Sequence, residues 1–193
     1  MRSNGIASVD RRAVEEAVVQ LLKAVGEDPA REGLIETPRR IADMYQEVLQ
    51  GQYEDAREVL QVGFEENHQE MVIVRDIAFY SLCEHHLLPF HGHFHVGYIP
   101  RGRVVGISKL ARVVDVFASR LQLQERLTSQ IADILMEELH PAGVAVVGSA
   151  EHLCMTMRGV KKPGTLVVTS ANRGLFRDNE ATRLEFFAAL RER

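Results

Sequence analysis

The two cysteines of this 193-residue chain each lie two positions from a histidine. One stands in Cys83-Glu84-His85-His86, and the other ends His152-Leu153-Cys154. Cys83, His86 and Cys154 would give Zn²⁺ two thiolates and one imidazole and leave its fourth position free. A structural zinc is normally closed by four protein ligands, whereas a catalytic zinc keeps one position for water. Three candidate ligands therefore favour a catalytic metal.

The same residues allow other interpretations. A free cysteine is commonly buried and packs like a small hydrophobic side chain. A closed structural zinc would need His85 or His152 as its fourth ligand. The alternating histidines of His91-Gly92-His93-Phe94-His95 form another possible metal-binding pattern. A solvated or hydrogen-bonded strand face is favoured for them, because they lack a matching partner elsewhere in the chain.

The second cysteine follows an alternating pattern that predicts a strand over residues 144–157. In a strand, side chains two positions apart point to the same face. His152, Cys154 and Thr156 would therefore share one face with Arg158 just beyond them. One strand would deliver an imidazole, a thiolate and a guanidinium to a single surface.

The first cysteine requires a turn. Cys83 and His86 are three positions apart, so a straight strand would place them on opposite faces. They can share a metal only if the chain turns there, and Pro89 shortly afterwards favours a strand giving way to a loop. His85 would then point away from His86 and be free to carry a proton.

A group suited to an anion follows Gly106, where Ser108-Lys109-Leu110-Ala111-Arg112 opens a predicted helix. Free N–H groups and the helix dipole favour an anion at such a position. Lys109 and Arg112 are three apart and reach the same side. With Arg158 they give three cations for one polyanion, although lysine and arginine on a helix more often form a solvated face.

Gln124-Glu125-Arg126 opens the next predicted helix. A carboxylate in the first turn is expected from the helix dipole alone. The functional interpretation of Glu125 is bidentate acceptance from two adjacent N–H donors, such as those on the Watson–Crick edge of guanine.

Hydrophobic periodicity predicts the elements that must position these residues. The Thr37 hydroxyl is expected to cap its helix, with Pro38 in the first turn. Residues 65–70 are expected to form an acidic loop. The predicted helices are 9–25, 37–50, 108–120, 122–139 and 178–191, the last capped by Asp178 or Asn179, and the predicted strands are 71–74, 77–80, 93–99, 144–157 and 165–169.

This order predicts an α+β fold with an antiparallel sheet. Residues 1–70 would form an N-terminal helical arm, and residues 71–193 the catalytic domain with a C-terminal helix. Apolar residues make up 46% of the chain and charged residues 26%, as in an ordinary globular protein.

Composition also limits the partners and the compartment. The net charge of −4 offers no global basic field for nucleic acid or an anionic membrane. The sequence shows no segment with the length and apolarity of a membrane span and no apolar signal-peptide core after Met1. With two cysteines and no export signal, a reducing cytoplasm and free thiols or thiolate ligands are expected.

Taken together, four motifs resemble GTP cyclohydrolase I, and the resemblance covers nearly the whole chain from Thr37-Pro38 to the terminal helix. The motifs stand in the same order as in that family. They are Cys83-Glu84-His85-His86, Gly106-Ile107-Ser108-Lys109-Leu110-Ala111-Arg112, Gln124-Glu125-Arg126-Leu127-Thr128 and Glu151-His152-Leu153-Cys154-Met155-Thr156-Met157-Arg158-Gly159.

The resemblance implies a tunnelling fold (T-fold), a four-stranded antiparallel sheet backed by two helices, assembled into a toroidal homodecamer with active sites at subunit interfaces. It implies conversion of GTP and water to 7,8-dihydroneopterin triphosphate and formate, at the entry to folate or pterin biosynthesis. The residues it implies are Cys83, His86 and Cys154 as zinc ligands, His85 and His152 for proton transfer, Gln124 and Glu125 for guanine, and Ser108, Lys109, Arg112 and Arg158 for the triphosphate.

One position departs from the family pattern. Some relatives carry a phosphate-binding lysine shortly after the Thr-Pro motif, where this chain has Asp43, and Arg40 is the candidate to replace it. Two rival functions are another T-fold enzyme acting on a purine or a preformed pterin, and a non-catalytic protein with a structural zinc. The complete phosphate cluster argues against the first, and formate release from GTP would separate both from the main hypothesis.

Overall fold

The computed structural model describes residues 8–191, and its chain divides into two compact units at Glu54. The first unit holds α1 (Arg11–Ala24), α2 (Thr37–Val48) and the 3₁₀ helix η1 (Gln50–Gln52). The helical arm was predicted to extend to residue 70, but residues 55–70 belong to the second unit. Residues 1–7 of the predicted arm lie outside the described part of the chain.

The helices of the first unit begin at different kinds of cap. The Asp10 carboxylate caps α1 by accepting a hydrogen bond from the Ala13 N–H at 3.1 Å. The prediction that the Thr37 hydroxyl caps α2 is wrong: Glu36 already has helical backbone angles, so Thr37 is the first residue inside the helix. Pro38 lies in the first turn as expected. Helical structure does not stop at Gly51, which is buried within η1.

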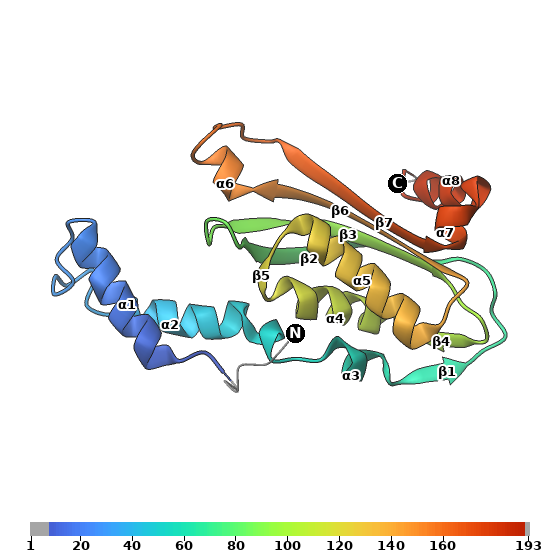
Figure 1. The fold of residues 1–193 in the computed structure, drawn as a ribbon, viewed down its shortest axis with the longest axis horizontal. Helices are drawn as coiled ribbons and strands as arrows, with labels where there is room; N and C mark the ends of the chain where they lie inside the picture. The colour runs from blue at the N-terminus through green and yellow to red at the C-terminus, as the bar shows by residue number, and fades with distance from the viewer. Residues whose placement is uncertain (1–7, 192–193) are drawn as a thin grey trace. The chain divides into compact units, whose positions relative to one another are not determined.

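The second unit is α+β, as the sequence predicts (Figure 1). Its helices are α3 (Ala56–Leu60), α4 (Ile107–Ala118), α5 (Gln124–Leu139), α6 (Leu153–Thr156), α7 (Leu175–Asp178) and α8 (Glu180–Ala189). Its strands are β1 (Gly63–Glu65), β2 (Val72–Cys83), β3 (Pro89–Ile99), β4 (Arg103–Val105), β5 (Leu121–Gln122), β6 (Gly143–His152) and β7 (Leu166–Gly174).

The main sheet has the strand order β5-β2-β3-β6-β7. The four long strands pair antiparallel with their neighbours, and the two-residue β5 adds a fifth, parallel strand beside the end of β2. A second sheet joins β1 to β4. Neither β1 nor β4 was predictable, because strands of three residues are too short to show a period.

Helices α4 and α5 pack on one face of this sheet, and α7 and α8 lie on the opposite face near the C-terminal end of β7 (Figure 1). On the α4–α5 face, β3 contributes Phe90, Phe94 and Tyr98, all fully buried. Burying one phenylalanine side chain stabilises the fold by about 2–3 kcal/mol. On the opposite face, Phe186 of α8 packs so closely over Gly97 that a Cβ there would lie 2.7 Å from the ring.

The two extended segments predicted at 71–74 and 77–80 are one strand, β2, interrupted by a bulge between Val74 and Ile77. Asp76 has a positive φ of 56° in this bulge, and its N–H donates to Nδ1 of His95 on β3 at 3.2 Å. His95 is therefore a hydrogen-bonded residue of the sheet. The helix predicted over residues 178–191 is α8, and the side chain of Asn179 caps it by accepting a hydrogen bond from the Thr182 N–H at 3.0 Å. The short helix α7, which precedes it, was not predicted.

The strand predicted over residues 144–157 ends at His152, and this is the largest error in the predicted elements. His152 pairs with Phe90 of β3, and Glu151 pairs with Leu166, the first residue of β7. Beyond these pairs β7 has ended and β3 extends only to Pro89, which has no N–H to donate, and residues 153–156 form the short helix α6 instead. The prediction that His152, Cys154, Thr156 and Arg158 share a strand face is therefore wrong.

Candidate active site

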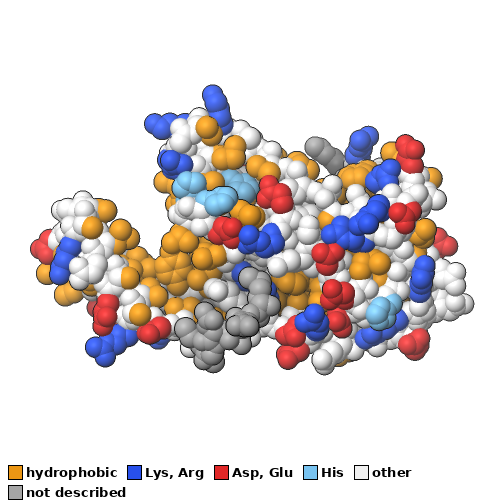
Figure 2. Space-filling view, viewed as in Figure 1, with side chains coloured by type: hydrophobic (Ala, Val, Ile, Leu, Met, Phe, Trp, Pro, Cys, Tyr) orange, Lys and Arg blue, Asp and Glu red, His pale blue; other side chains and the backbone are white. Residues whose placement is uncertain are grey.

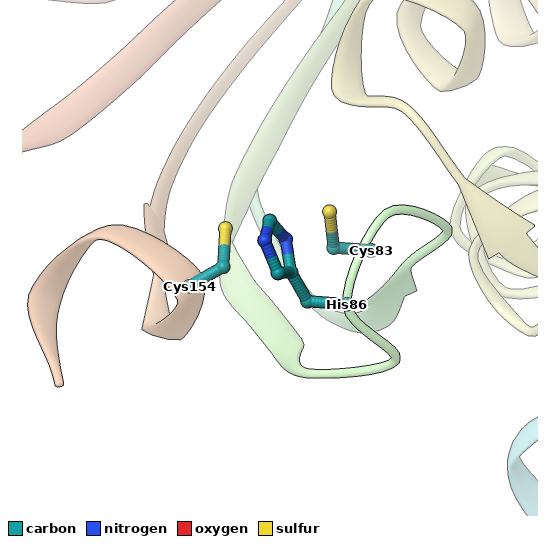
Figure 3. Close-up of side chains that lie close together, drawn as sticks. All are labelled: Cys83, His86 and Cys154. Carbon is teal, nitrogen blue, oxygen red and sulfur yellow. The ribbon is translucent and has the colours of Figure 1, made fainter. Parts of the chain in front are cut away.

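Cys83, His86 and Cys154 nevertheless converge (Figure 3). One potential ligand atom from each residue lies within 4.8 Å of the other two. A tetrahedral zinc with Zn–S bonds of about 2.3 Å would hold two sulfurs about 3.8 Å apart. The three donors need only a small contraction to share such an ion, and their soft chemistry suits zinc.

The turn expected between Cys83 and His86 is present. The Cys83 carbonyl accepts hydrogen bonds from the N–H groups of His86 at 3.3 Å and Leu87 at 2.8 Å, and Leu87 adopts a positive φ of 54°. The Cys83 N–H donates to the Leu88 carbonyl at 2.9 Å, which closes the loop. Pro89 begins β3 after this turn.

The environment of the Cys154 thiol opposes charge on it when no cation is near. Burial raises the pKa of the Cys154 thiol, and the adjacent Cys83 raises it further, while Arg158 opposes both effects. Two neighbouring thiolates repel each other, whereas a dication between them would stabilise both. Together, proximity and donor type make this group fit Zn²⁺.

No other group of three potential metal ligands occurs among residues 8–191. The alternating histidines His91, His93 and His95 do not form such a group with one another. Neither His85 nor His152 joins the group of three, so a closed structural site lacks a fourth ligand from this part of the chain.

His152 lies beside the group in a fixed orientation. Its Nε2 is 2.7 Å from Oε1 of Gln124, and its ring stacks on Phe90 with centroids 4.6 Å apart and planes 7° from parallel. Burial lowers the pKa of His152, and the charge of nearby Glu125 partly offsets this effect. The imidazole is therefore predominantly neutral near pH 7.

His85 has a different setting from His86. Their ring centroids are 6.4 Å apart and their ring planes are nearly perpendicular, at 89°. The side chains of His85 and His86 are both exposed. In Figure 2 histidine side chains gather near the β2–β3 turn and α6, and Lys and Arg side chains lie beyond them.

Gln124 and Glu125 are adjacent at the start of α5 but differ in exposure. Gln124 is buried, with 1% of its surface accessible, and its side-chain amide bonds only to groups of the protein. Glu125 is exposed. Of the two residues expected to bind guanine, only Glu125 presents a free side chain to solvent.

An ion pair that the sequence analysis did not single out joins two of the motifs. Arg126 of α5 donates two hydrogen bonds to Glu84, at 2.5 and 3.0 Å. The hydrogen bond from Arg126 lowers the pKa of Glu84, and the same contact raises the pKa of Arg126. The pair connects the Cys83–His86 loop to the residue next to Glu125. Both residues were visible inside the quoted motifs, but their spacing could not reveal a contact 42 positions apart.

The predicted anion-binding residues divide between two places. Arg158 lies at the metal group, with Nη1 3.3 Å from Nε2 of His86. The other three, Ser108, Lys109 and Arg112, lie in the first two turns of α4. The opposite end of this helix is fixed near Cys83, because the Ser81 hydroxyl donates a hydrogen bond to the Ala118 carbonyl at 2.7 Å.

At 1.5 Å per residue, the ten residues from Ser108 to Ala118 span about 15 Å. Ser108 and Arg112 are exposed, whereas Leu110 and Val113 of the same helix are buried against the sheet. Within one chain the structure therefore does not bring Ser108 and Arg112 to the metal group.

Arg40 is exposed on α2 in the first unit. Asp43, at the position of the expected lysine, is engaged by Arg11 and Arg39 of the same unit. Within residues 8–191, every helix is too short or too polar to cross a membrane.

Comparison with known proteins gives a consistent result. The family model described as GTP cyclohydrolase I matches residues 14–191. GTP cyclohydrolase 1 of Pelotomaculum thermopropionicum is 62% identical over 94% of this chain and 97% of its own length, and that of Bacillus subtilis is 59% identical over 92% and 94%. Among solved structures, apo archaeosine synthase QueF-Like gives a TM-score of 0.44 at 24% identity, covering 54% of this chain and 93% of that one, which is too weak to support a conclusion.

Proposed function

Because this chain belongs to the GTP cyclohydrolase I family, we propose that Cys83, His86 and Cys154 hold the zinc ion of its active site. The chain converts GTP and water to 7,8-dihydroneopterin triphosphate and formate, the first step of folate and pterin biosynthesis. The observation that supports the proposal is the convergence of two thiols and an imidazole from two separate segments. When bound, Zn²⁺ would supply a Lewis acid that activates water next to C8 of guanine.

The proton transfers fall to two histidines that are not ligands. Two thiolates would formally neutralise the charge of a bound zinc ion and make it a weaker activator of water than one held by three neutral imidazoles, so a general base from the protein is needed. His85 and His152 divide this work: one protonates N7, which makes C8 electrophilic, and the other accepts a proton from the attacking water. Ring opening leaves a formamide, a second hydrolysis releases formate, and the ribose carbons close the pterin ring.

Glu125 is the residue for the guanine edge. Its carboxylate can accept two hydrogen bonds from the adjacent N1–H and 2-amino groups, a pattern that adenine does not offer. The support for this assignment is its exposed position in the first turn of α5, near enough to His152 to affect the pKa of that residue. Guanine held there by one edge would present its imidazole ring to His152.

The triphosphate requires residues from more than one copy of the chain. Arg158 lies at the metal group, whereas Ser108, Lys109 and Arg112 begin a helix whose far end lies beside that group. The exposed residues of this face of α4 can serve the metal group of a neighbouring subunit. This division supports active sites at the interfaces of a homodecamer built from T-fold subunits, with Arg40 as a further phosphate contact in place of the lysine of some relatives.

We further propose that the enzyme acts in the cytoplasm, with GTP as its small-molecule partner and without binding nucleic acid or membrane. The net charge of −4 supports these assignments because it provides no global attraction for polyanions. The free cysteines, which a reducing compartment preserves, agree with them.

Formate release tests the zinc assignment. Zinc-loaded protein should release formate in an amount equal to the GTP consumed, and a strong chelator should stop this. Cys83→Ser and Cys154→Ser should lose both zinc and formate release, because an alcohol is a poor zinc ligand. His93→Gln is the matched control on the neighbouring strand and should retain both. Full activity of either cysteine variant without zinc would refute the proposal.

A further inference from the structure

We propose that the side chain of Gln124 does not bind guanine but is a positioning residue, which holds His152 with its proton on Nε2 and its lone pair on Nδ1. The inference rests on the proposed role of His152 in proton transfer. It goes beyond that role by assigning the nitrogen that faces the substrate and the residue that fixes it. It also separates Gln124 from Glu125, the neighbour with which it was expected to share the guanine base.

The orientation of the Gln124 amide follows from its partners. Nε2 lies 3.2 Å from the Gly148 carbonyl, 2.9 Å from the Val167 carbonyl and 3.1 Å from the Thr169 hydroxyl. Carbonyl oxygens only accept hydrogen bonds, so the atom facing both of them must be the NH₂ group. In the opposite orientation the Gln124 oxygen would face the carbonyl oxygens of Gly148 and Val167, and none of these three atoms carries a hydrogen to donate.

This orientation determines the tautomer of His152. Oε1 of Gln124 can only accept, and it lies 2.7 Å from Nε2 of His152. Nε2 must therefore carry a hydrogen whatever the charge of the ring, and whenever the ring is neutral Nδ1 is its acceptor. The stacking of Phe90 on the ring fixes the imidazole plane, while the Gln124 bond fixes its rotation within that plane.

Gln124 is itself held rigidly. Its backbone carbonyl accepts a hydrogen bond from the Thr128 hydroxyl at 2.7 Å, and the hydroxyls of Thr128 and Thr169 are 2.6 Å apart. The side chain is buried, and both of its N–H groups are directed to protein acceptors. It therefore has no N–H left to donate to a bound base.

A fixed tautomer matters because a histidine presents only one acceptor nitrogen when it is neutral. Loss of an outer hydrogen bond that orients a functional side chain typically costs about 10–100-fold in activity. Loss of a guanine contact would instead weaken GTP binding and reduce discrimination against other purine nucleotides. The two roles therefore predict different kinetic changes.

Gln124→Met tests this difference, because methionine has a similar length but no hydrogen bond for His152. We expect kcat to fall about 10–100-fold, with KM for GTP, the preference for GTP over ATP, and zinc content unchanged. Glu125→Gln is the matched neighbour control and should lose that preference. A Gln124→Met enzyme with unchanged kcat, or with raised KM and lost preference for GTP, would overturn the inference.

Two further measurements keep the test decisive. Neutron diffraction of the unaltered zinc-loaded enzyme at about pH 8, where a histidine is neutral, should locate deuterium on Nε2 of His152. Deuterium on Nδ1 alone would contradict the inference even if Gln124→Met fails to fold. Full turnover by His152→Ala would refute the proposed role of His152, whereas an inactive His152→Ala beside a fully active Gln124→Met would refute only the inference about Gln124.

Discussion

At the scale of the residue, the two cysteine thiols determine how the site responds to pH. Burial and the proximity of Cys83 raise the pKa of Cys154, so without metal this thiol is protonated at pH 7. Zinc binds thiolates, so the proton must leave when the ion binds. The contacts that disfavour charge on the free Cys154 thiol therefore couple metal binding to proton release.

Zinc affinity should accordingly rise with pH over the range in which the thiols are protonated. If each of Cys83 and Cys154 releases one proton, the association constant rises by up to about 100-fold per pH unit. Competition with a chelator between about pH 6 and 8 measures this slope, and calorimetry in buffers of different ionisation enthalpy measures the protons released. Affinity independent of pH would show that the thiols are not the ligands.

The types of the candidate ligand residues were also the feature of the site that was easiest to predict from the sequence. The donor types and spacing of Cys83, His86 and Cys154 favoured a shared metal site, and the three residues converge, although the strand face assumed for His152 and Cys154 is wrong. The role of Gln124 was not accessible in this way, because its partners lie 24 to 45 positions away and only the folded sheet brings them to its amide. A glutamine next to an exposed glutamate gives no local sign of burial.

At the scale of the element, the end of β6 shows why a local period can mislead. Residues 152–158 alternate as a strand would, yet a strand persists only where a neighbour can pair with it. β7 ends opposite Glu151, and β3 extends only one residue past the partner of His152, to a proline that cannot donate a hydrogen bond. Cys154 therefore reaches the metal group from α6. The helices α4 and α5 were predictable because helical hydrogen bonds are local and their buried faces recur every three to four residues.

The ion pair between Glu84 and Arg126 is the element-scale contact that fixes the metal-binding loop against α5. Arg126→Ala should shift the loop relative to Glu125 and lower kcat/KM for GTP about tenfold or more, since small displacements of reacting groups are costly. The reversed pair Glu84→Arg with Arg126→Glu should recover part of this loss.

Arg57→Ala provides the matched control for this experiment. Arg57 forms ion pairs with Glu137 and Glu138 of α5, at 3.5 and 3.3 Å, at the other end of that helix. Its loss should leave kcat/KM essentially unchanged. If Arg126→Ala and Arg57→Ala behave alike, the Glu84–Arg126 pair has no special role in positioning the site.

At the scale of the whole molecule, the separation of the metal group from the start of α4 predicts subunit complementation. Cys83→Ser and Lys109→Ala should each be inactive. When the two are unfolded and refolded together in equal amounts, about a quarter of the sites should receive intact residues from both contributing chains. Steady-state formate release measures the recovery.

Each variant refolded alone is the control for this mixing experiment and should remain inactive. A mixture with no recovered activity, formed from variants that do assemble together, would mean that one chain supplies the whole site. The number of subunits was predicted only from the resemblance to the GTP cyclohydrolase I family, because no local sequence pattern indicates how many copies of the chain assemble. Residues 55–65 fall in the second unit for a related reason: α3 contacts α4 and α5, and β1 contacts β4, all of which are distant in sequence.

The coordination of the bound ion tests the central claim most directly. Diffraction from the zinc-loaded protein, with anomalous data at the zinc absorption edge, should show one ion per chain bound by the sulfurs of Cys83 and Cys154 and a nitrogen of His86. Its fourth ligand should be solvent or substrate. Zinc held by a fourth protein side chain such as His85 or His152, or bound at another place in the chain, would contradict the account.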